Sequence, residues 1–153
     1  MRIYAPDEHA TEALGAALAK RARAGDVLLL SGPLGAGKTS LARAFIRTLA
    51  QDMALIIPSP SFTLVQHYDI PGTAIWHFDL WRLTGPEALE ELGWDEAQAG
   101  IVLVEWPDRL GALTPASALR ITLSHATSHA TSHATPGGRE ITLEGEDRWF
   151  DAS

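Results

Sequence analysis

One glycine-rich segment has the residue types and spacing that are needed to hold a chain of phosphates. Residues 32–39 read Gly-Pro-Leu-Gly-Ala-Gly-Lys-Thr and fit the pattern G-x-x-x-x-G-K-[ST] of a phosphate-binding P-loop. In such a loop, backbone N–H groups and the start of the next helix face the anion. The lysine contacts the β- and γ-phosphates, and the hydroxyl contacts Mg²⁺. The nucleotide-binding residues predicted from this segment are Gly32, Gly35, Ala36, Gly37, Lys38, Thr39 and Ser40.

Two carboxylates that follow predicted strands are candidates for holding Mg²⁺ or for orienting the attacking water. Glu105 follows the apolar run 101–104, and Asp79 follows the run 74–78. The C-terminal ends of parallel strands line the crevice beside the P-loop, so we expect both side chains there. Which of the two binds the metal directly stays open. The predicted catalytic residues are Lys38, Glu105 and Asp79, and the predicted metal ligands are Thr39, Glu105 and Asp79.

Other residue types near these motifs allow more than one interpretation. Trp106 directly follows Glu105, and we expect it at the mouth of the site, in contact with the nucleotide. The hydroxyl-rich segment 59–63 either senses the γ-phosphate through Ser61, as switch loops do, or is ordinary turn chemistry. Three histidines, His125, His129 and His133, have a helical spacing that suits a metal, but their repeat context favours a flexible loop.

The elements around these residues predict an α/β fold. A buried strand precedes the P-loop and an amphipathic helix follows it, as in the first half of a βαβ unit. We predict a P-loop NTPase-like three-layer sandwich with a mainly parallel central sheet, helices on both faces and a C-terminal edge hairpin. The predicted helices are 8–23, 38–50 and 86–92, and the predicted strands are 2–5, 27–31, 62–68, 74–80, 101–106, 119–123 and 140–143.

Length and composition fit one globular domain, residues 1–153. The absence of Cys excludes disulfide scaffolds, zinc fingers and thiol nucleophiles. The formal net charge of −7 disfavours a free-standing nucleic-acid binder. Neither a signal peptide nor a membrane-spanning run is visible, so we expect a cytoplasmic protein with no membrane contact.

Two further features bear on the ligand and on the C-terminal region. The chain contains no Asn and therefore no Asn-Lys-x-Asp guanine-recognition motif, which makes ATP the expected nucleotide, together with Mg²⁺. Three tandem copies of Ser-His-Ala-Thr occupy 124–135, and Pro-Gly-Gly follows them. We interpret residues 124–138 as a flexible loop inserted in the predicted hairpin.

Taken in order, five motifs resemble the TsaE family, small bacterial ATPases of tRNA threonylcarbamoyladenosine (t6A) biosynthesis. The resemblance extends from about residue 6 to residue 123. Two departures are Ser61, where the family usually has Thr, and Trp81, where it usually has Tyr. The motifs are GPLGAGKT at 32–39, SPSFTLV at 59–65, HFDLWRL at 77–83, EELG at 90–93 and VEWP at 104–107.

The resemblance implies a Mg²⁺-dependent ATPase that is weak alone and does not itself modify tRNA. It would act on a TsaB–TsaD heterodimer, which transfers threonylcarbamoyl to adenosine 37 of ANN-decoding tRNAs. A TsaC-type threonylcarbamoyl-AMP synthase would act upstream, and tRNA would be met only through the partners. Two alternatives remain: an independent small-molecule kinase, and a nucleotide-gated binding module without catalysis.

Overall fold

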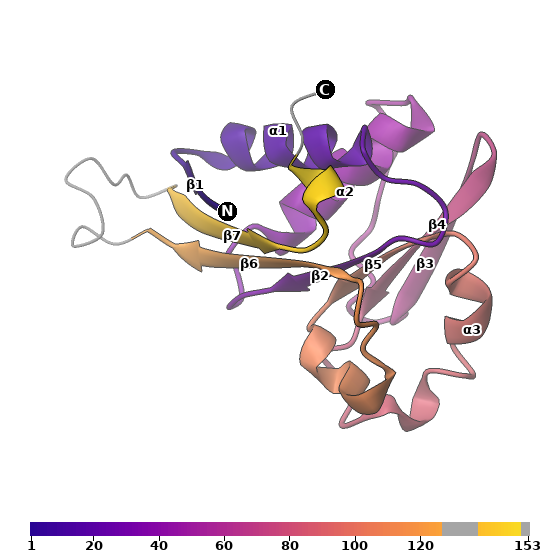
Figure 1. Cartoon of the computed structure of the whole chain (residues 1–153). Coiled ribbons are helices and arrows are strands. Elements are labelled where there is room, and N and C mark those ends of the chain that lie inside the picture. Colours follow the sequence, from indigo (N-terminus) through magenta and orange to yellow (C-terminus); the bar gives the residue numbers. More distant parts are fainter. Residues whose placement is uncertain (127–137, 151–153) are drawn as a thin grey trace.

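The computed structural model describes residues 1–126 and 138–150 and places a mixed β-sheet in the middle layer (Figure 1). Within these residues the sheet has seven strands in the order β1-β7-β6-β2-β5-β4-β3. The strands are β1 (Arg2–Ala5), β2 (Val27–Ser31), β3 (Val65–Ile70), β4 (Thr73–Asp79), β5 (Ile101–Glu105), β6 (Leu119–His125) and β7 (Arg139–Glu144).

The centre of the sheet is parallel, as predicted. Strands β6, β2, β5 and β4 run in one direction, while β3, β7 and β1 pair antiparallel with their neighbours. The C-terminal hairpin is formed by β6 and β7, but it is not at the edge of the sheet. The N-terminal β1 pairs with the outer side of β7, with Ile3 opposite Ile141, and takes the edge position.

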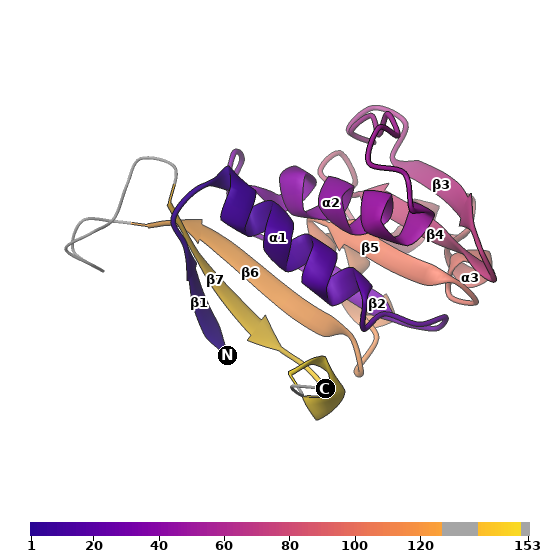
Figure 2. The same ribbon diagram turned by 90° about the horizontal axis from the view of Figure 1, so that it is seen from above.

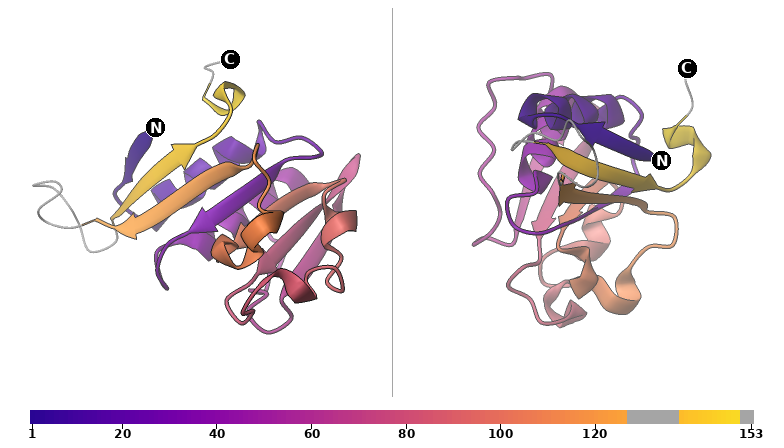
Figure 3. Two further views of the ribbon diagram at one scale, coloured as in Figure 1. Left: turned by 60° about the horizontal axis from the view of Figure 1, so that its bottom comes forward. Right: turned by 90° about the vertical axis from the view of Figure 1, so that its left-hand side faces the viewer.

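Helical segments cover both faces of the sheet. Helices α1 (Glu8–Ala19) and α2 (Lys38–Ala50) lie side by side on one face (Figure 2). The opposite face carries the short segments η1 (Pro86–Ala88), α3 (Trp94–Ala97) and η2 (Pro107–Leu113) (Figure 3). A last turn, η3 (Asp147–Trp149), follows β7. Helix α1 approaches α2 closely because Gly15 has no side chain: a Cβ there would lie 2.5 Å from the Leu41 carbonyl oxygen.

Strand alternation divides the core into two layers and fixes where the acidic side chains point. On β2, Leu28 and Leu30 pack beneath α1 and α2, and the intervening residues face the other layer. Strand β5 has the same alternation, so Glu105 is on the face of α2. In the β4–β5 ladder Asp79 is directly paired with Glu105, which places both carboxylates at the same end of the sheet.

Three predicted elements differ from the structure. The helix predicted over 8–23 ends at Ala19, because a tight turn follows in which Asp26 accepts a hydrogen bond from the backbone of Arg23. The strand predicted over 62–68 begins only at Val65, since the preceding residue has left-handed backbone dihedrals. The helix predicted over 86–92 is reduced to the 3-10 turn η1 at its start, and residues 89–93 form turns. The α-helical segment α3 begins only after Gly93, whose φ is 87°.

Candidate functional site

The P-loop joins β2 to α2 and wraps around its own lysine. Gly32, Gly35 and Gly37 all have positive φ, which residues with a side chain rarely adopt. A side chain at Gly32 would also collide with the carbonyl oxygen of Leu123 on β6. The segment therefore needs its glycines both for curvature and for its close approach to the neighbouring strand.

Lys38 is 5 % exposed and lies in the centre of this loop. Its ammonium donates hydrogen bonds to the carbonyl oxygens of Gly32 and Pro33, and it lies 3.7 Å from the centroid of the Trp106 ring. Burial lowers the pKa of Lys38 from its ordinary value of 10.5, although the nearby Glu105, Asp79 and Asp108 carboxylates act in the opposite direction.

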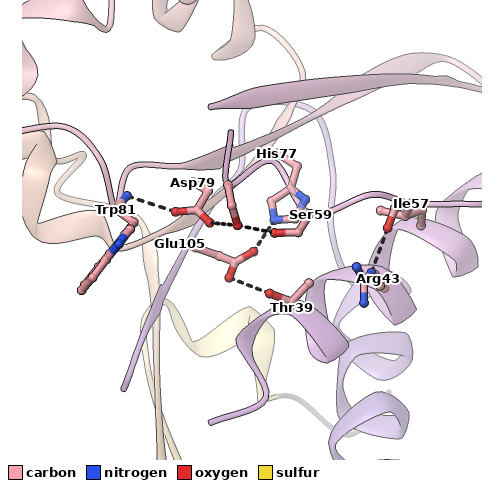
Figure 4. A network of polar contacts seen from close by, with 9 residues as sticks. Thr39, Arg43, Ile57, Ser59, His77, Asp79, Trp81 and Glu105 are labelled. Atoms are coloured by element: carbon pink, nitrogen blue, oxygen red, sulfur yellow. Dashed lines mark hydrogen bonds and ion pairs between the residues drawn. The ribbon is translucent and has the colours of Figure 1, made fainter. Parts of the chain in front are cut away.

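Glu105 connects the P-loop helix to the sheet (Figure 4). Its Oε1 accepts a hydrogen bond of 3.0 Å from the Thr39 hydroxyl at the start of α2, and its Oε2 lies 2.7 Å from Nε2 of His77. All three side chains are contributed by separate elements, α2, β4 and β5. The carboxylate is thereby held at both oxygens, and one of them faces the phosphate-binding loop.

Asp79 is held from the other side by a loop that precedes β3. Its Oδ2 accepts from the Ser61 hydroxyl at 3.2 Å, and its Oδ1 accepts from the backbone N–H of Trp81 at 3.0 Å. The hydroxyls of Ser59 and Ser61 are 2.8 Å apart, and Arg43 of α2 anchors the start of this loop by donating to the Ile57 carbonyl (Figure 4). The hydroxyl-rich segment thus contacts the acidic pair directly.

A cavity of about 390 Å³ opens over these groups. One end contains the acids, Lys38 and Trp106, and the other end lies between α1, the P-loop and β7. From the predicted set, the residues that line this cavity are Gly35, Gly37, Lys38, Thr39, Ser40, Ser61, Asp79, Glu105 and Trp106, whereas Gly32 and Ala36 do not line it. The lining residues that the structure adds are Glu8, Thr11, Leu34 and Arg139.

Several residues of the site were not predicted from the sequence. His77 precedes Asp79 by two positions, so strand alternation was a signal that it shares the acidic face. Arg139 reaches from β7 to donate to the carbonyls of Gly35 (2.9 Å) and Ala36 (3.0 Å), and no local pattern indicates that long-range contact. Helix α1 also contributes to the site: Glu8 at its start accepts a 2.8 Å hydrogen bond from the Ser40 hydroxyl.

Thr11 is the second α1 residue in the cavity wall. It is 1 % exposed, and its hydroxyl has no hydrogen-bond partner among the residues that the structure describes. A Cβ on Gly37 would meet the Thr11 methyl group at 3.4 Å, so this threonine packs directly on the P-loop. A buried hydroxyl without a partner typically costs about 1–3 kcal/mol, which a ligand atom can offset.

Arg82, Arg109 and His125 do not line this cavity. Arg82 lies over the ring of Phe62 at 4.8 Å, and Arg109 pairs with the neighbouring Asp108. Of the repeat histidines, His125 ends β6, whereas 127–137, with His129 and His133, fall outside the described residues. In the part of the chain that the structure covers, no three His, Cys, Asp or Glu residues form a metal cluster, and no helix has the length and apolar character to span a membrane.

Comparison with known proteins identifies the relatives of this arrangement. A family model described as "Threonylcarbamoyl adenosine biosynthesis protein TsaE" matches residues 5–134. The chain belongs to the TsaE family. Among curated members, the "tRNA threonylcarbamoyladenosine biosynthesis protein TsaE" of Rickettsia felis is 37% identical over 118 residues, or 76% of this chain and 68% of that one. The Synechocystis protein of the same name is 38% identical over 118 residues, 74% of each chain.

A solved structure supports the fold. The crystal structure of Bacillus subtilus YdiB superposes with a TM-score of 0.75 at 28% identity and covers 98% of this chain and 88% of that one. The family resemblance inferred from the five motifs is therefore confirmed, and so is the α/β architecture.

Proposed function

We propose that this chain is the Mg²⁺-dependent ATPase that supports t6A modification of adenosine 37 in ANN-decoding tRNAs. The observation that carries the proposal is the hydrogen bond between Thr39 and Glu105. It joins the P-loop hydroxyl to a carboxylate at a strand end, beside the buried ammonium of Lys38. These are the three groups that a P-loop enzyme needs for phosphates, metal and water.

The donor set fits Mg²⁺. Hydroxyl and carboxylate oxygens are the ligands that this ion prefers, and Mg²⁺ is usually held by one or two carboxylates together with waters and substrate phosphates. Thr39 and Glu105 would hold it, with Asp79 on the adjacent strand. When bound, the ion would neutralise charge on the phosphates.

The two carboxylates have different surroundings, which suggests different roles. Glu105 shares a hydrogen bond with Thr39 and would approach the same cation. Asp79 is fixed by Ser61 and by the backbone N–H of Trp81, so its carboxylate is oriented toward the side of the loop where a water can attack. In this proposal Glu105 acts mainly on the metal and Asp79 mainly on the water.

The far end of the cavity would receive the nucleoside. The phosphates occupy the P-loop, and the remaining wall is formed by Glu8, Thr11 and Arg139. A carboxylate at Glu8 repels phosphate and suits the uncharged hydroxyls of a ribose, while the Thr11 hydroxyl has an unused donor and acceptor. This end of the site supports a nucleotide rather than a bare phosphate chain.

A protein partner at the mouth of the cavity agrees with the exposed side chains there. Phe62 is 80 % exposed and Leu34, in the P-loop, is 69 % exposed. We propose that this partner is a TsaB–TsaD heterodimer and that a TsaC-type synthase acts upstream of it. The chain would contact tRNA only through these partners, in the cytoplasm. The net charge of −7 agrees with an indirect role in tRNA binding.

ATP turnover by the purified chain, alone and with TsaB and TsaD, tests the proposal. Stimulation by the partners that is lost in Glu105→Gln, but kept in Glu144→Gln on the exposed part of β7, would support it. Equal turnover with and without partners, together with phosphate transfer to a metabolite, would instead favour the small-molecule kinase. A Glu105→Gln chain that restores t6A in cells lacking the native copy would contradict a catalytic role.

A further inference from the structure

His77 and Glu105 form a buried side-chain pair that the proposed chemistry does not by itself explain. His77 is 0 % exposed and Glu105 is 2 % exposed, and Nε2 lies 2.7 Å from Oε2. The histidine comes from the middle of β4 and not from the P-loop. Placing an imidazole in the core is costly unless its polar atoms are used, so this contact needs a physical reason.

We propose that His77 is a positioning residue that holds the Glu105 carboxylate in the orientation needed for Mg²⁺ and nucleotide. This inference rests on the proposed ATPase function. A carboxylate offers two oxygens, and at Glu105 they have separate tasks: Oε2 is held by the imidazole, and Oε1 is directed at the Thr39 hydroxyl. Without the imidazole, rotation of the carboxylate would let Oε1 leave the Thr39 hydroxyl.

The chemistry of the pair fixes the tautomer. A carboxylate only accepts hydrogen bonds, so the proton of the contact belongs to Nε2 and His77 is the donor. Among the described residues Nδ1 has no hydrogen-bond partner, so Glu105 is the group to which the imidazole of His77 is directed.

The same arrangement places His77 behind the proposed metal ligand Glu105 and not among the groups that line the cavity. Hydrogen-bond partners of metal-binding side chains orient those ligands, and their loss usually reduces metal affinity or activity about ten- to a hundredfold. His77 faces Glu105 from the core side, while Thr39 approaches from the cavity side (Figure 4). It therefore influences the site through Glu105 alone.

Two substitutions of similar size and polarity separate positioning from simple packing. In His77→Gln the side-chain amide nitrogen lies as many bonds from Cβ as Nε2 and can donate to Glu105. In His77→Asn the amide nitrogen lies one bond closer to Cβ, at the position of Nδ1, and cannot reach Glu105. His67→Asn, at an exposed histidine on neighbouring β3, is the matched control. The readouts are the ratio of ATP dissociation constants with and without Mg²⁺, kcat, KM and the thermal midpoint.

We expect His77→Gln and the control to keep the Mg²⁺ effect on ATP affinity. We expect His77→Asn to lose this effect, to reduce kcat about ten- to a hundredfold and to leave the ATP affinity without Mg²⁺ unchanged. If the Gln and Asn variants lost the Mg²⁺ effect equally, or if ATP affinity without Mg²⁺ fell together with the thermal midpoint, His77 would have a packing role. Either result would overturn this inference but not the proposed ATPase function. An unmodified chain whose ATP affinity does not respond to Mg²⁺ would overturn the inference and the proposed function together.

Discussion

The ammonium of Lys38 lies 3.7 Å from the centroid of the Trp106 ring. Trp106 reaches this position because its backbone is left-handed, with φ 58°, an uncommon conformation for a residue with a side chain. Trp81 packs against the same indole at a centroid distance of 4.3 Å. Trp106, supported by Trp81, thus covers the cation of the P-loop, which agrees with the lowered pKa of Lys38 through burial.

Replacement of this cation tests its role in binding. Lys38→Met removes the charge but keeps a side chain of similar length, so we expect ATP affinity to fall at least about tenfold, as expected for loss of a hydrogen bond to a charged group. The fold should persist, because a buried ammonium is replaced by an apolar group. Lys20→Met at the only other lysine is the control, and calorimetric titration is the measurement. Unchanged ATP affinity in Lys38→Met would contradict the site.

The lowered pKa of Lys38 predicts that ATP affinity declines with rising pH before an ordinary lysine would titrate. Phosphate binds the protonated amine, and burial lowers the pKa from 10.5, so the decline begins below that value. Rising pH has the opposite effect on the stability of the fold. Between the lowered pKa of Lys38 and 10.5 the unfolded chain binds more protons than the folded chain, so the free energy of unfolding increases as the pH rises. Titrations across alkaline pH check the first effect, and Lys38→Met should remove it. A flat profile in the native chain would refute it.

The hydroxyl of Thr11 should contribute to binding of the nucleoside and not of the phosphates. Thr11→Val preserves shape and removes the unpartnered hydroxyl, so ATP should bind about two- to tenfold more weakly, the effect of one hydrogen bond. Inorganic triphosphate should bind as before, and the thermal midpoint should not fall. Thr142→Val on β7 is the control. Weakening of both ligands alike would place Thr11 at the phosphates instead.

Arg139 should stabilise the P-loop through its two carbonyl contacts. Arg139→Lys keeps the charge but cannot bridge Gly35 and Ala36 with a planar group, so we expect a loss of about 1 kcal/mol in the free energy of unfolding and weaker ATP binding. Chemical denaturation provides the first value. The exposed Arg120→Lys on β6 should change neither quantity, and equal effects at both positions would mean that the contacts to the loop carry no energy.

Local patterns in the sequence were sufficient for the P-loop and for the strands that flank it. The apolar run before Gly32 and the carboxylate after residues 101–104 are each recognised from a few adjacent residues. Because the C-terminal ends of parallel strands lie at the same edge of the sheet, Glu105 is then expected beside the loop. The family motifs added the remaining order of the elements. These features were predictable because each depends on a few consecutive residues.

Features that depend on distant pairing were not predictable in the same way. Arg139 reaches the P-loop only because β7 pairs with β6 beside β2, and Thr11 enters the cavity only because Gly15 lets α1 approach α2. His77 is an intermediate case, since alternation places it on the face of Asp79, but its distance to Glu105 depends on the β4–β5 register.

The hydrogen bonds from Lys38 to the carbonyls of Gly32 and Pro33 hold the P-loop curved around a positive charge. When a phosphate chain binds, its oxygens replace these carbonyls as partners of the Lys38 ammonium. The loop does not have to become ordered, which limits the conformational entropy lost on binding. Segments that fold on binding give large negative changes in heat capacity. Nucleotide binding to this chain should therefore lack the large negative heat-capacity change of a segment that folds on binding, and calorimetry at several temperatures checks this.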